Sequence, residues 1–526
     1  MTNNLLDSAQ NGALTVYQRV ERVFDGVFGA ALNPWRHLGS LGFLFFWIIV
    51  ITGLYLYAVL DTSVDGAYRS INWLSREQWY LGGVLRSLHR YAADAFVLVT
   101  LLHLLREFLL GRFTGFRHFS WLTGVPLLWF IYISGVVGIW LRWDQLAQFS
   151  AAATAEWLDA LPLFATPLIR NFLSATAVSD RLFSLFVFVH IGVPLLLIFG
   201  LWFHIQRISR AEVLPPFALS VGTFLALLAL SFALPIASQA AAELSLVPGV
   251  LALDWFYLFW QPMMYATSAG AVWALVAVVT VFLFVLPALP HAPASPIAEV
   301  HPDNCNGCRR CFEDCPYAAI AMVPHPSAIV GRQLAQVIPD LCASCGICAG
   351  ACPSSTPFRS AAELVTGIDM PQMPIDGLRR ELERGLAQFE GSDGIVVFGC
   401  DQGARVASLK GKNLARISLI CTGMLPPSFV EYALRGGAAG VLVTGCREGG
   451  CAFRLGNRWT GERLAGMREP HFRALTPGKA LHIAWAGRGE EARLGVVLDT
   501  MRRALAAERL HNTHPVAAPI ADLMVP

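Results

Sequence analysis

The chain has 526 residues, of which 55% are hydrophobic and 14% are charged, and its formal net charge is +2. This composition is too apolar for a soluble protein of this size, so it predicts several membrane spans. The net charge by itself indicates no partner. The sequence carries no nucleic-acid-binding signature, and we expect no nucleic acid among its partners.

The first predicted element is an amphipathic helix along the membrane surface, within residues 1–36. Its apolar positions recur at helical spacing on one face, which is typical of an interfacial helix. They are Val16, Val20, Phe24 and Phe28. Because this stretch is charged and lacks a short basic region with a cleavage site, we expect no signal peptide.

Six apolar segments of membrane-spanning length follow within residues 37–290. They cover residues 38–60, 81–109, 119–141, 182–208, 217–239 and 263–289. The connections on one side of these segments are rich in arginine: Arg19, Arg22, Arg36, Arg106, Arg112, Arg117, Arg207 and Arg210. The positive-inside rule therefore predicts a multi-pass protein of a bacterial inner membrane with both termini in the cytoplasm.

Two histidine pairs share one internal spacing. His89 and His103 lie in the second segment and His190 and His204 in the fourth, each pair 14 residues apart. At about 3.6 residues per turn and about 1.5 Å rise, both members of a pair face the same way, about 21 Å apart along the axis. Two such helices facing each other predict two bis-histidine sites stacked across the membrane, which suits two b-type haems.

The residues around these histidines resemble cytochrome b of the quinol:cytochrome c and quinol:plastocyanin oxidoreductases. The resemblance rests on GGVLRSLHRYAADAFVLVTLLHLLRE (82–107) and FVFVHIGVPLLLIFGLWFHIQR (186–207). It implies that His89 pairs with His190 near the periplasmic face and that His103 pairs with His204 near the cytoplasmic face. Dimers are usual in that family, which implies a homodimer or a larger complex here.

Glycines and arginines accompany the histidines. Two glycines 14 residues apart lie in the first segment and two in the third, where only glycine lets a helix backbone approach a flat porphyrin; small-residue helix packing is the alternative. Two arginines lie one turn from a histidine and would pair with haem propionates or extend to lipid headgroups. These expected haem-binding residues are Gly39, Gly53, Gly124, Gly138, Arg86 and Arg106.

The stretch LDWFYLFWQPMMY (253–265) resembles the quinol-oxidising part of the same family. There a Pro-Glu-Trp-Tyr motif supplies a glutamate that takes a proton from quinol. Here the carboxylate is Asp254, one methylene shorter, and the family's Pro-Trp-Gly motif becomes Arg142-Trp143-Asp144. The resemblance implies a catalytic role for Asp254, and an ordinary loop acid is the alternative.

All 12 cysteines lie between residues 305 and 451. Residues 305–316 read CNGCRRCFEDCP and residues 342–353 read CASCGICAGACP. Both runs are C-x2-C-x2-C-x3-C-P, typical of bacterial ferredoxins with two [4Fe–4S] clusters, in which the fourth cysteine binds the other cluster. We therefore expect an α+β ferredoxin domain over residues 297–358, with zinc as the alternative. The expected ligand sets are Cys305, Cys308, Cys311 and Cys352, and Cys342, Cys345, Cys348 and Cys315.

Residues 390–510 alternate short β-rich runs with helical stretches, and residues 511–526 read as a tail. The runs IVVFGC, ISLICTG and AGVLVTGC each end near a cysteine. Because the carboxyl ends of parallel strands meet at one edge, this pattern predicts a small α/β domain with one four-cysteine iron–sulfur site. Buried free cysteines and zinc are the alternatives. The cysteines are Cys400, Cys421, Cys446 and Cys451.

The segment ICTGMLPPSFVEYALRGGAAGVLVTGCREGGCAFRLGN (420–457) resembles the iron–sulfur delta subunit of methyl-viologen-reducing hydrogenases, which is associated with heterodisulfide reductase. The resemblance implies a [2Fe–2S] cluster. It also implies a cytoplasmic partner that is a flavoprotein similar to heterodisulfide reductase.

The sequence as a whole predicts a multi-domain oxidoreductase subunit: a six-span α-helical di-haem bundle, a two-cluster ferredoxin domain and a small α/β iron–sulfur domain. It would link membrane quinone, through the haems and clusters, to the flavoprotein, in a direction that the sequence leaves open. No G-x-G-x-x-G opens a strand–helix unit, so a flavin or nicotinamide would bind another subunit. The alternative function is a redox sensor or membrane anchor without its own turnover.

Overall fold

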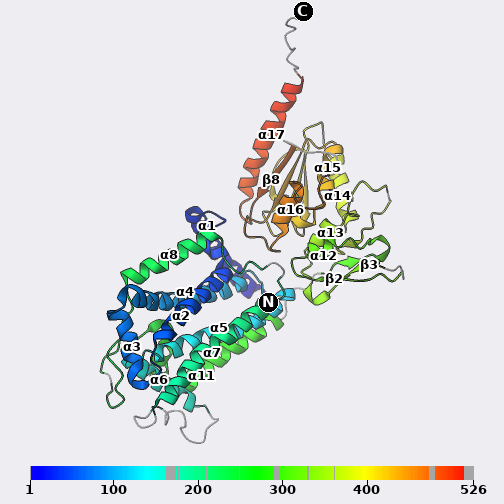
Figure 1. Cartoon of the computed structure of the whole chain (residues 1–526). Helices are drawn as coiled ribbons and strands as arrows, with labels where there is room; N and C mark the ends of the chain where they lie inside the picture. Colours follow the sequence, from blue (N-terminus) through cyan, green and yellow to red (C-terminus); the bar gives the residue numbers. More distant parts are fainter. Residues whose placement is uncertain are drawn as a thin grey trace, which may run out of the picture. The chain divides into compact units, whose positions relative to one another are not determined.

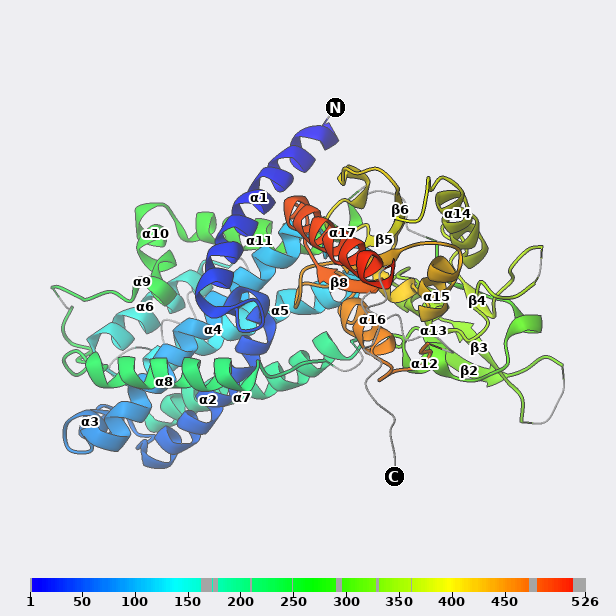
Figure 2. The same cartoon turned by 90° about the horizontal axis from the view of Figure 1, so that it is seen from above.

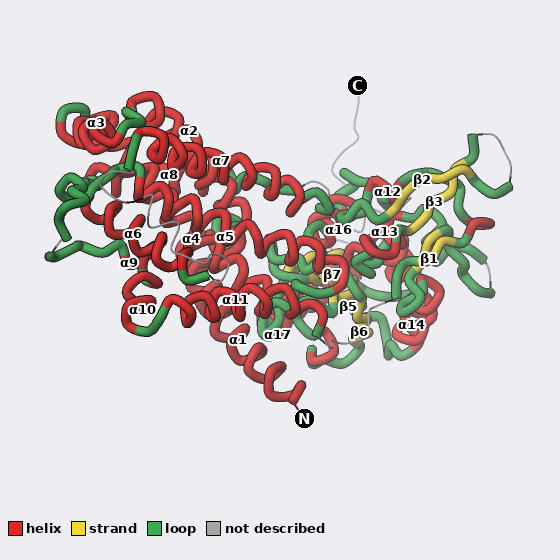
Figure 3. Tube along the Cα trace, turned by 90° about the horizontal axis from the view of Figure 1, so that it is seen from below, coloured by secondary structure: helices red, strands yellow, loops and turns green. Residues whose placement is uncertain are grey.

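The computed structural model of the chain describes residues 2–161, 173, 178–208, 211–247, 249–289, 296–327, 331–360, 362–472 and 480–513, with side chains from residue 10 except 11 and 508–513. The chain forms two compact units, Met1–Arg207 with Ala211–Ala292, and Ile208–Arg210 with Pro293–Pro526. The first unit is helical, and the named strands of the described residues all lie in the second (Figures 1 and 3). Arg210 and most of the expected tail, residues 511–526, fall outside these residues.

Six long helices of the first unit fall on the six predicted segments: α2 (Leu38–Val59), α4 (Val84–Leu109), α5 (His118–Trp140), α7 (Asp180–Ile205), α8 (Phe217–Ala233) and α11 (Ala269–Val285). Four segments are long and apolar enough to cross a membrane, namely α2, α7, Gly115–Trp140 and Ala269–Ala288. The helix α4 is long enough but carries charged residues, and α8 has 17 residues. Structure therefore supports four of the six expected spans directly.

Two of the expected spans have different ends in the structure. The fifth was predicted to reach residue 239, but α8 stops at Ala233, because Pro235 restricts the residue before it and cannot continue a helix. The sixth was predicted to begin at residue 263, but α11 begins at Ala269, where the Ser268 hydroxyl caps it by accepting from Ala271 N at 3.1 Å.

The first unit is built around two helix pairs, α2 against α4 and α5 against α7, with α4 also contacting α5 (Figure 2). A hydrophobic cluster that includes Leu88, Phe96, Ile131 and Leu197 joins α4, α5 and α7. The outward side of α7 stays apolar, since Phe188 is 72% exposed. Exposed apolar side chains on the outside of such a bundle are typical of a lipid-facing surface.

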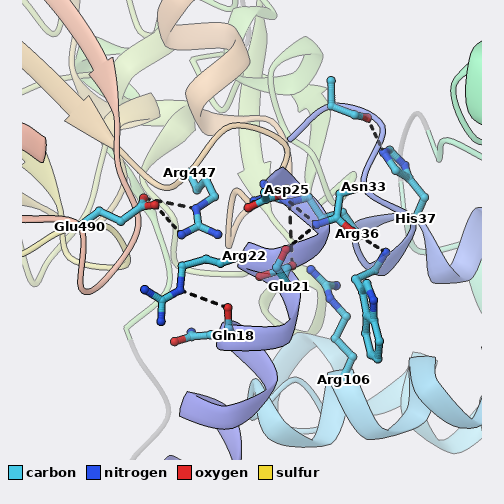
Figure 4. A network of polar contacts seen from close by, with 12 residues as sticks. Gln18, Glu21, Arg22, Asp25, Asn33, Arg36, His37, Arg106, Arg447 and Glu490 are labelled. Carbon is cyan, nitrogen blue, oxygen red and sulfur yellow. Dashed lines mark hydrogen bonds and ion pairs between the residues drawn. The ribbon is translucent and has the colours of Figure 1, made fainter. Parts of the chain in front are cut away.

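The N-terminal helix α1 (Thr2–Phe28) is tied to the turn that leads into α2 (Figure 4). The Asp25 carboxylate accepts hydrogen bonds from Arg36 Nη2 and from Asn33 Nδ2, both at 2.8 Å. Val16 on this helix is 60% exposed. A helix thus covers the predicted stretch, and its position along a membrane surface stays a prediction.

Shorter helices connect these elements. They are η1 (Pro34–Arg36), α3 (Val64–Arg76), the π-helix η2 (Trp79–Gly83), η3 (Gly115–Arg117), α6 (Gln145–Asp159), α9 (Trp255–Leu258), α10 (Trp260–Ala266) and η5 (Leu286–Ala288).

The second unit begins with two small antiparallel sheets. One pairs β1 (Glu299–Val300) with β4 (Ile368–Asp369), and the other pairs β2 (Ile320–Pro324) with β3 (Gln333–Val337). The helices α12 (Arg310–Glu313) and α13 (Ile347–Ala351) lie in the two cysteine runs, and η6 (Pro302–Asn304) and η7 (Pro339–Leu341) precede them. The predicted ferredoxin segment covers residues 297–358 and therefore contains β1. Its partner strand β4 lies beyond the predicted end of the segment.

The rest of the second unit is a parallel sheet of order β6-β5-β7-β8. Its strands are β5 (Ile395–Cys400), β6 (Leu414–Leu419), β7 (Gly440–Gly445) and β8 (Leu481–Trp485), and its helices are α14 (Ile375–Ala387), η8 (Val406–Ser408), η9 (Thr422–Met424), α15 (Pro427–Arg435), α16 (Gly456–Leu464) and α17 (Glu491–Thr513). Every residue of β5 and β7 is buried, as expected for central parallel strands with both faces covered. Beyond the sheet edge, Arg447 Nη2 pairs with Glu490 Oε1 at 2.5 Å (Figure 4).

Candidate haem and iron–sulfur sites

The two histidine pairs face each other across the helix pairs as the sequence predicts. The ring centroids of His89 and His190 are 6.3 Å apart, and those of His103 and His204 are 6.5 Å apart. An iron bound at about 2 Å from one nitrogen of each ring would separate the ring centres by about 6 Å. Both pairs therefore fit a bis-histidine haem.

Hydrogen bonds orient two of these rings for metal binding. His89 Nδ1 donates to the Ile49 carbonyl of α2, and His190 Nδ1 donates to the Ser134 carbonyl of α5, both at 3.0 Å. Since a carbonyl can only accept, Nδ1 carries the proton and Nε2 keeps its lone pair for iron. His204 Nδ1 lies 3.3 Å from the Thr123 hydroxyl.

The four predicted glycines lie against the four histidine rings. A Cβ at Gly53 would lie 3.0 Å from His89 Cε1, and one at Gly138 would lie 2.7 Å from His190 Cε1. At the other pair, the distances to the nearest ring atom would be 3.5 Å for Gly39 and 3.2 Å for Gly124. Each ring thus rests on a helix backbone that has no side chain at that point.

We expect the substitution Gly138→Ala to lower haem occupancy at the His190 site. The added methyl would displace the His190 ring, because 2.7 Å is closer than real Cβ contacts come. The measurement is the pyridine haemochrome content of purified protein, with Gly192→Ala on α7 as the control, since nothing lies within 4 Å of a Cβ there. Equal haem content in the two variants would contradict the expectation.

The two predicted propionate partners are both largely buried but differ in their contacts. Arg86 donates to the hydroxyls of Ser75 at 2.6 Å and Ser238 at 2.8 Å. Arg106 pairs with Glu107 Oε1 at 3.3 Å, while its buried Nε has no hydrogen-bond partner among the described residues. An unsatisfied buried donor near His103 fits a haem carboxylate, so Arg106 meets this test better than Arg86.

Asp254 belongs to a charged cluster that the sequence did not reveal. Its Oδ2 lies 2.6 Å from Arg90 Nη2, and Asp94 Oδ1 lies 3.1 Å from the same nitrogen. Its Oδ1 caps α9 by accepting from Phe256 N and Tyr257 N at 3.2 Å.

The eight cysteines of the two runs lie close to one another in the second unit, and their division into two crosswise sets stays a prediction. The Cys311 thiol interacts electrostatically with Cys352, Cys308 and Cys305. We call these four cysteines the first set. The second set, Cys315, Cys342, Cys345 and Cys348, lines one small cavity. Its other walls are mostly apolar, so the cavity suits a compact cluster.

The two cysteine runs fold into matching loops. Gly307 and Ser344 occupy equivalent positions with φ of 70° and 55°, and Arg309 and Gly346 occupy the next pair with φ of 67° and 74°. Burial raises the pKa of the Cys311 thiol to about 12. Such a thiol ionises when a metal supplies the compensating charge, which again fits a cluster.

The third set, Cys400, Cys421, Cys446 and Cys451, gathers at the carboxyl edge of the parallel sheet. Cys400 Sγ lies 3.9 Å from Cys446 Sγ, and a Cβ at Gly456 would touch Cys421 Sγ at 2.3 Å and Cys451 Sγ at 3.3 Å. Hydrogen bonds from the Cys421 and Cys446 thiols lower the pKa of Cys400. The same thiol–thiol contacts raise the pKa of Cys421 and of Cys446, so the four sulfurs form one hydrogen-bonded group.

In the described part of the chain, no three or more His, Cys, Asp or Glu side chains converge tightly enough to hold a single metal ion. A cluster is larger than one ion and spaces its thiolates more widely.

Sequence reasoning missed the partners that support these sites. The contacts of the Ile49 and Ser134 carbonyls cannot be predicted from the pattern of side chains, because every residue has a backbone carbonyl. Arg90 and Asp94 could have been noticed, since charges inside an apolar segment are costly and usually functional.

Comparison with known families accounts for much of the chain. Residues 23–211 match cytochrome b/b6/petB, residues 304–356 match the 4Fe-4S dicluster domain, and residues 404–507 match the methyl-viologen-reducing hydrogenase, delta subunit. Among solved structures, a chain titled "Hyperthermophilic respiratory Complex III" aligns at 17% identity with a TM-score of 0.41, over 52% of this chain and 82% of that chain. The chain thus joins a segment similar to cytochrome b, a segment similar to a two-cluster ferredoxin and a segment similar to the hydrogenase delta subunit.

Proposed function

We propose that this chain is the electron-transfer subunit that links membrane quinone to a cytoplasmic flavoprotein similar to heterodisulfide reductase. It would hold two b haems, two [4Fe–4S] clusters and one [2Fe–2S] cluster, with both termini in the cytoplasm of a bacterial inner membrane. It would act within a homodimer or a larger complex. Haem iron and iron–sulfur clusters supply one-electron chemistry when bound.

The observation that carries the proposal is that one chain holds both facing histidine pairs and three separate four-cysteine sets. In the first unit, His89, His190, His103 and His204 would be the axial ligands, and the glycines beside them leave room for the four imidazole rings. In the second unit, the cysteine sets would be the cluster ligands. The match to a hydrogenase delta subunit supports the flavoprotein partner.

A redox titration of the purified membrane protein tests this function. Haem absorbance and the EPR signals of the clusters are followed in two experiments. In one the protein is reduced with a quinol analogue, and in the other the clusters are reduced with a low-potential reductant. Haems and clusters that both respond to quinol establish the link and indicate flow from quinol toward the flavoprotein. Haems that respond only after the clusters are reduced indicate flow toward quinone. A purified protein that contains no haem would contradict the function proposed for the first unit.

We expect the substitution Asp254→Asn to slow haem reduction by quinol by about 100-fold, because a general base typically accelerates a reaction by at least that factor. Asparagine is as good a helix cap as aspartate, so α9 should persist while the proton acceptor is lost. The measurement is the rate of haem reduction by a quinol analogue in stopped flow. Asp65→Asn on α3, whose residue is exposed, is the control. An unchanged rate in Asp254→Asn would make this residue an ordinary loop acid.

A further inference from the structure

Within the second unit, the loop of the second cysteine set packs directly on the loop of the third set. A Cβ at Gly350 would lie 2.2 Å from the Gly423 carbonyl oxygen, and one at Gly423 would lie 2.7 Å from Ile347 Cγ1. Ile347 is completely buried between them. Two backbones that approach this closely leave no room for solvent or for another side chain between the loops.

One fully buried guanidinium joins the same two loops. Arg463 of α16 donates from Nη1 to the Gly423 carbonyl at 2.7 Å and pairs through Nη2 with Asp314 Oδ2 at 2.5 Å. Asp314 directly precedes Cys315 of the second set. Arg463 thus binds the backbone after Cys421 and the side chain that precedes Cys315 at once.

Two further arginines of the delta-subunit segment reach the ferredoxin segment. Arg468 Nη1 pairs with Asp314 Oδ1 at 2.5 Å, and Arg454 Nη1 donates to the Pro316 carbonyl at 3.1 Å. The residues on both sides of Cys315 are therefore held by the other segment. The first set has no such cover at Cys308, which is exposed.

Charged side chains of this joint lie beside the third set. The Asp314 carboxylate pairs with Arg463 and Arg468, and Arg468 also pairs with Glu462 Oε2 at 2.7 Å. Arg463 interacts electrostatically with Cys421. The Cys345 thiol of the second set interacts in the same way with Cys451 of the third. Because Arg463 is shielded from water, its charge acts on these sulfurs with little screening.

We propose that Arg463 is a positioning residue that fixes the order of the cluster sites and tunes the third one. The second set is the neighbour of the third, the first set lies at the far, exposed end, and Arg463 raises the reduction potential of the cluster in the third set. A positive charge favours the more negative, reduced state of a cluster. This inference rests on the proposed function for its clusters but requires neither quinone nor flavoprotein.

The order is tested in the full chain by EPR after chemical reduction. We expect the [2Fe–2S] signal to show splitting and faster relaxation from spin coupling to a reduced neighbour. Cys342→Ala, which removes a ligand of the second set, should abolish the coupling, while Cys308→Ala, which removes a ligand of the first set, should preserve it. Coupling that depends on Cys308 instead would overturn the proposed order.

The tuning is tested by potentiometric EPR titration of Arg463→Met and Arg463→Lys. We expect Arg463→Met to shift the [2Fe–2S] midpoint to a lower potential and to weaken the coupling, and Arg463→Lys to restore much of the potential because it keeps the charge. The matched control is Arg458→Met on the same helix, whose side chain is 65% exposed and pairs only locally with Glu462. It should match the wild type.

Three outcomes would count against the inference. A wild-type midpoint and wild-type coupling in Arg463→Met at full iron content would overturn it and leave the proposed function intact. If Arg463→Met fails to assemble clusters, the inference is tested by the Arg463→Lys titration and by the spin coupling in the wild type. A wild-type protein that holds all clusters but shows no spin coupling overturns the inference. A wild-type protein without clusters would overturn the proposed function as well.

Discussion

Replacing His190 with leucine is expected to remove one of the two haems, so that the haem content per protein falls by about half. The ring of His190 faces that of His89 at 6.3 Å between centroids, and its Nδ1–H is held by the Ser134 carbonyl. Leucine supplies no axial ligand and leaves His89 alone, whereas the pair of His103 and His204 is untouched. The measurement is the pyridine haemochrome content together with a redox titration, in which one of two b-type transitions should vanish.

The control for this substitution is His118→Leu at the first residue of α5, since His118 belongs to neither pair. It should keep both haems. Two remaining haem transitions in the His190→Leu protein would rule out His190 as an axial ligand, while loss of both would show that the two sites do not assemble independently.

The second large effect is expected for Cys421→Ala, which should abolish the [2Fe–2S] EPR signal and leave both [4Fe–4S] signals in place. The Cys421 thiol belongs to the hydrogen-bonded group that includes Cys400 and Cys451, so its loss opens the site on one side. Three thiolates cannot complete the four-cysteine ligation of such a cluster. Iron analysis and EPR of the dithionite-reduced protein measure the outcome.

Cys348→Ala is the converse of this substitution. It removes a buried ligand of the second set and should abolish one [4Fe–4S] signal while the [2Fe–2S] signal persists. Ser418→Ala on β6, close in sequence to Cys421 but outside the cysteine set, controls for damage to the sheet. A Cys421→Ala protein with an intact [2Fe–2S] signal would exclude the third set as its site.

The grouping of the cysteines and histidines could be predicted because it depends on residues that are close together in the sequence. Four helical turns separate His89 from His103 wherever the helix packs, and C-x2-C-x2-C closes one loop whatever surrounds it. The strand ends that carry Cys400, Cys421 and Cys446 follow from the parallel order of the sheet. The early end of α8 and the late start of α11 also have local signals, which are Pro235 and Ser268.

What the sequence by itself determined is therefore the inventory of ligands and the families of the three segments. Only the tertiary structure decided how residues far apart meet: the Ser134 carbonyl with His190, Asp254 with Arg90, and Arg463 with Asp314, which is 149 residues away. Such contacts depend on how helices and loops pack, and a backbone carbonyl or a paired arginine has no periodic spacing to reveal it. They orient and tune the sites that the local spacing had already located.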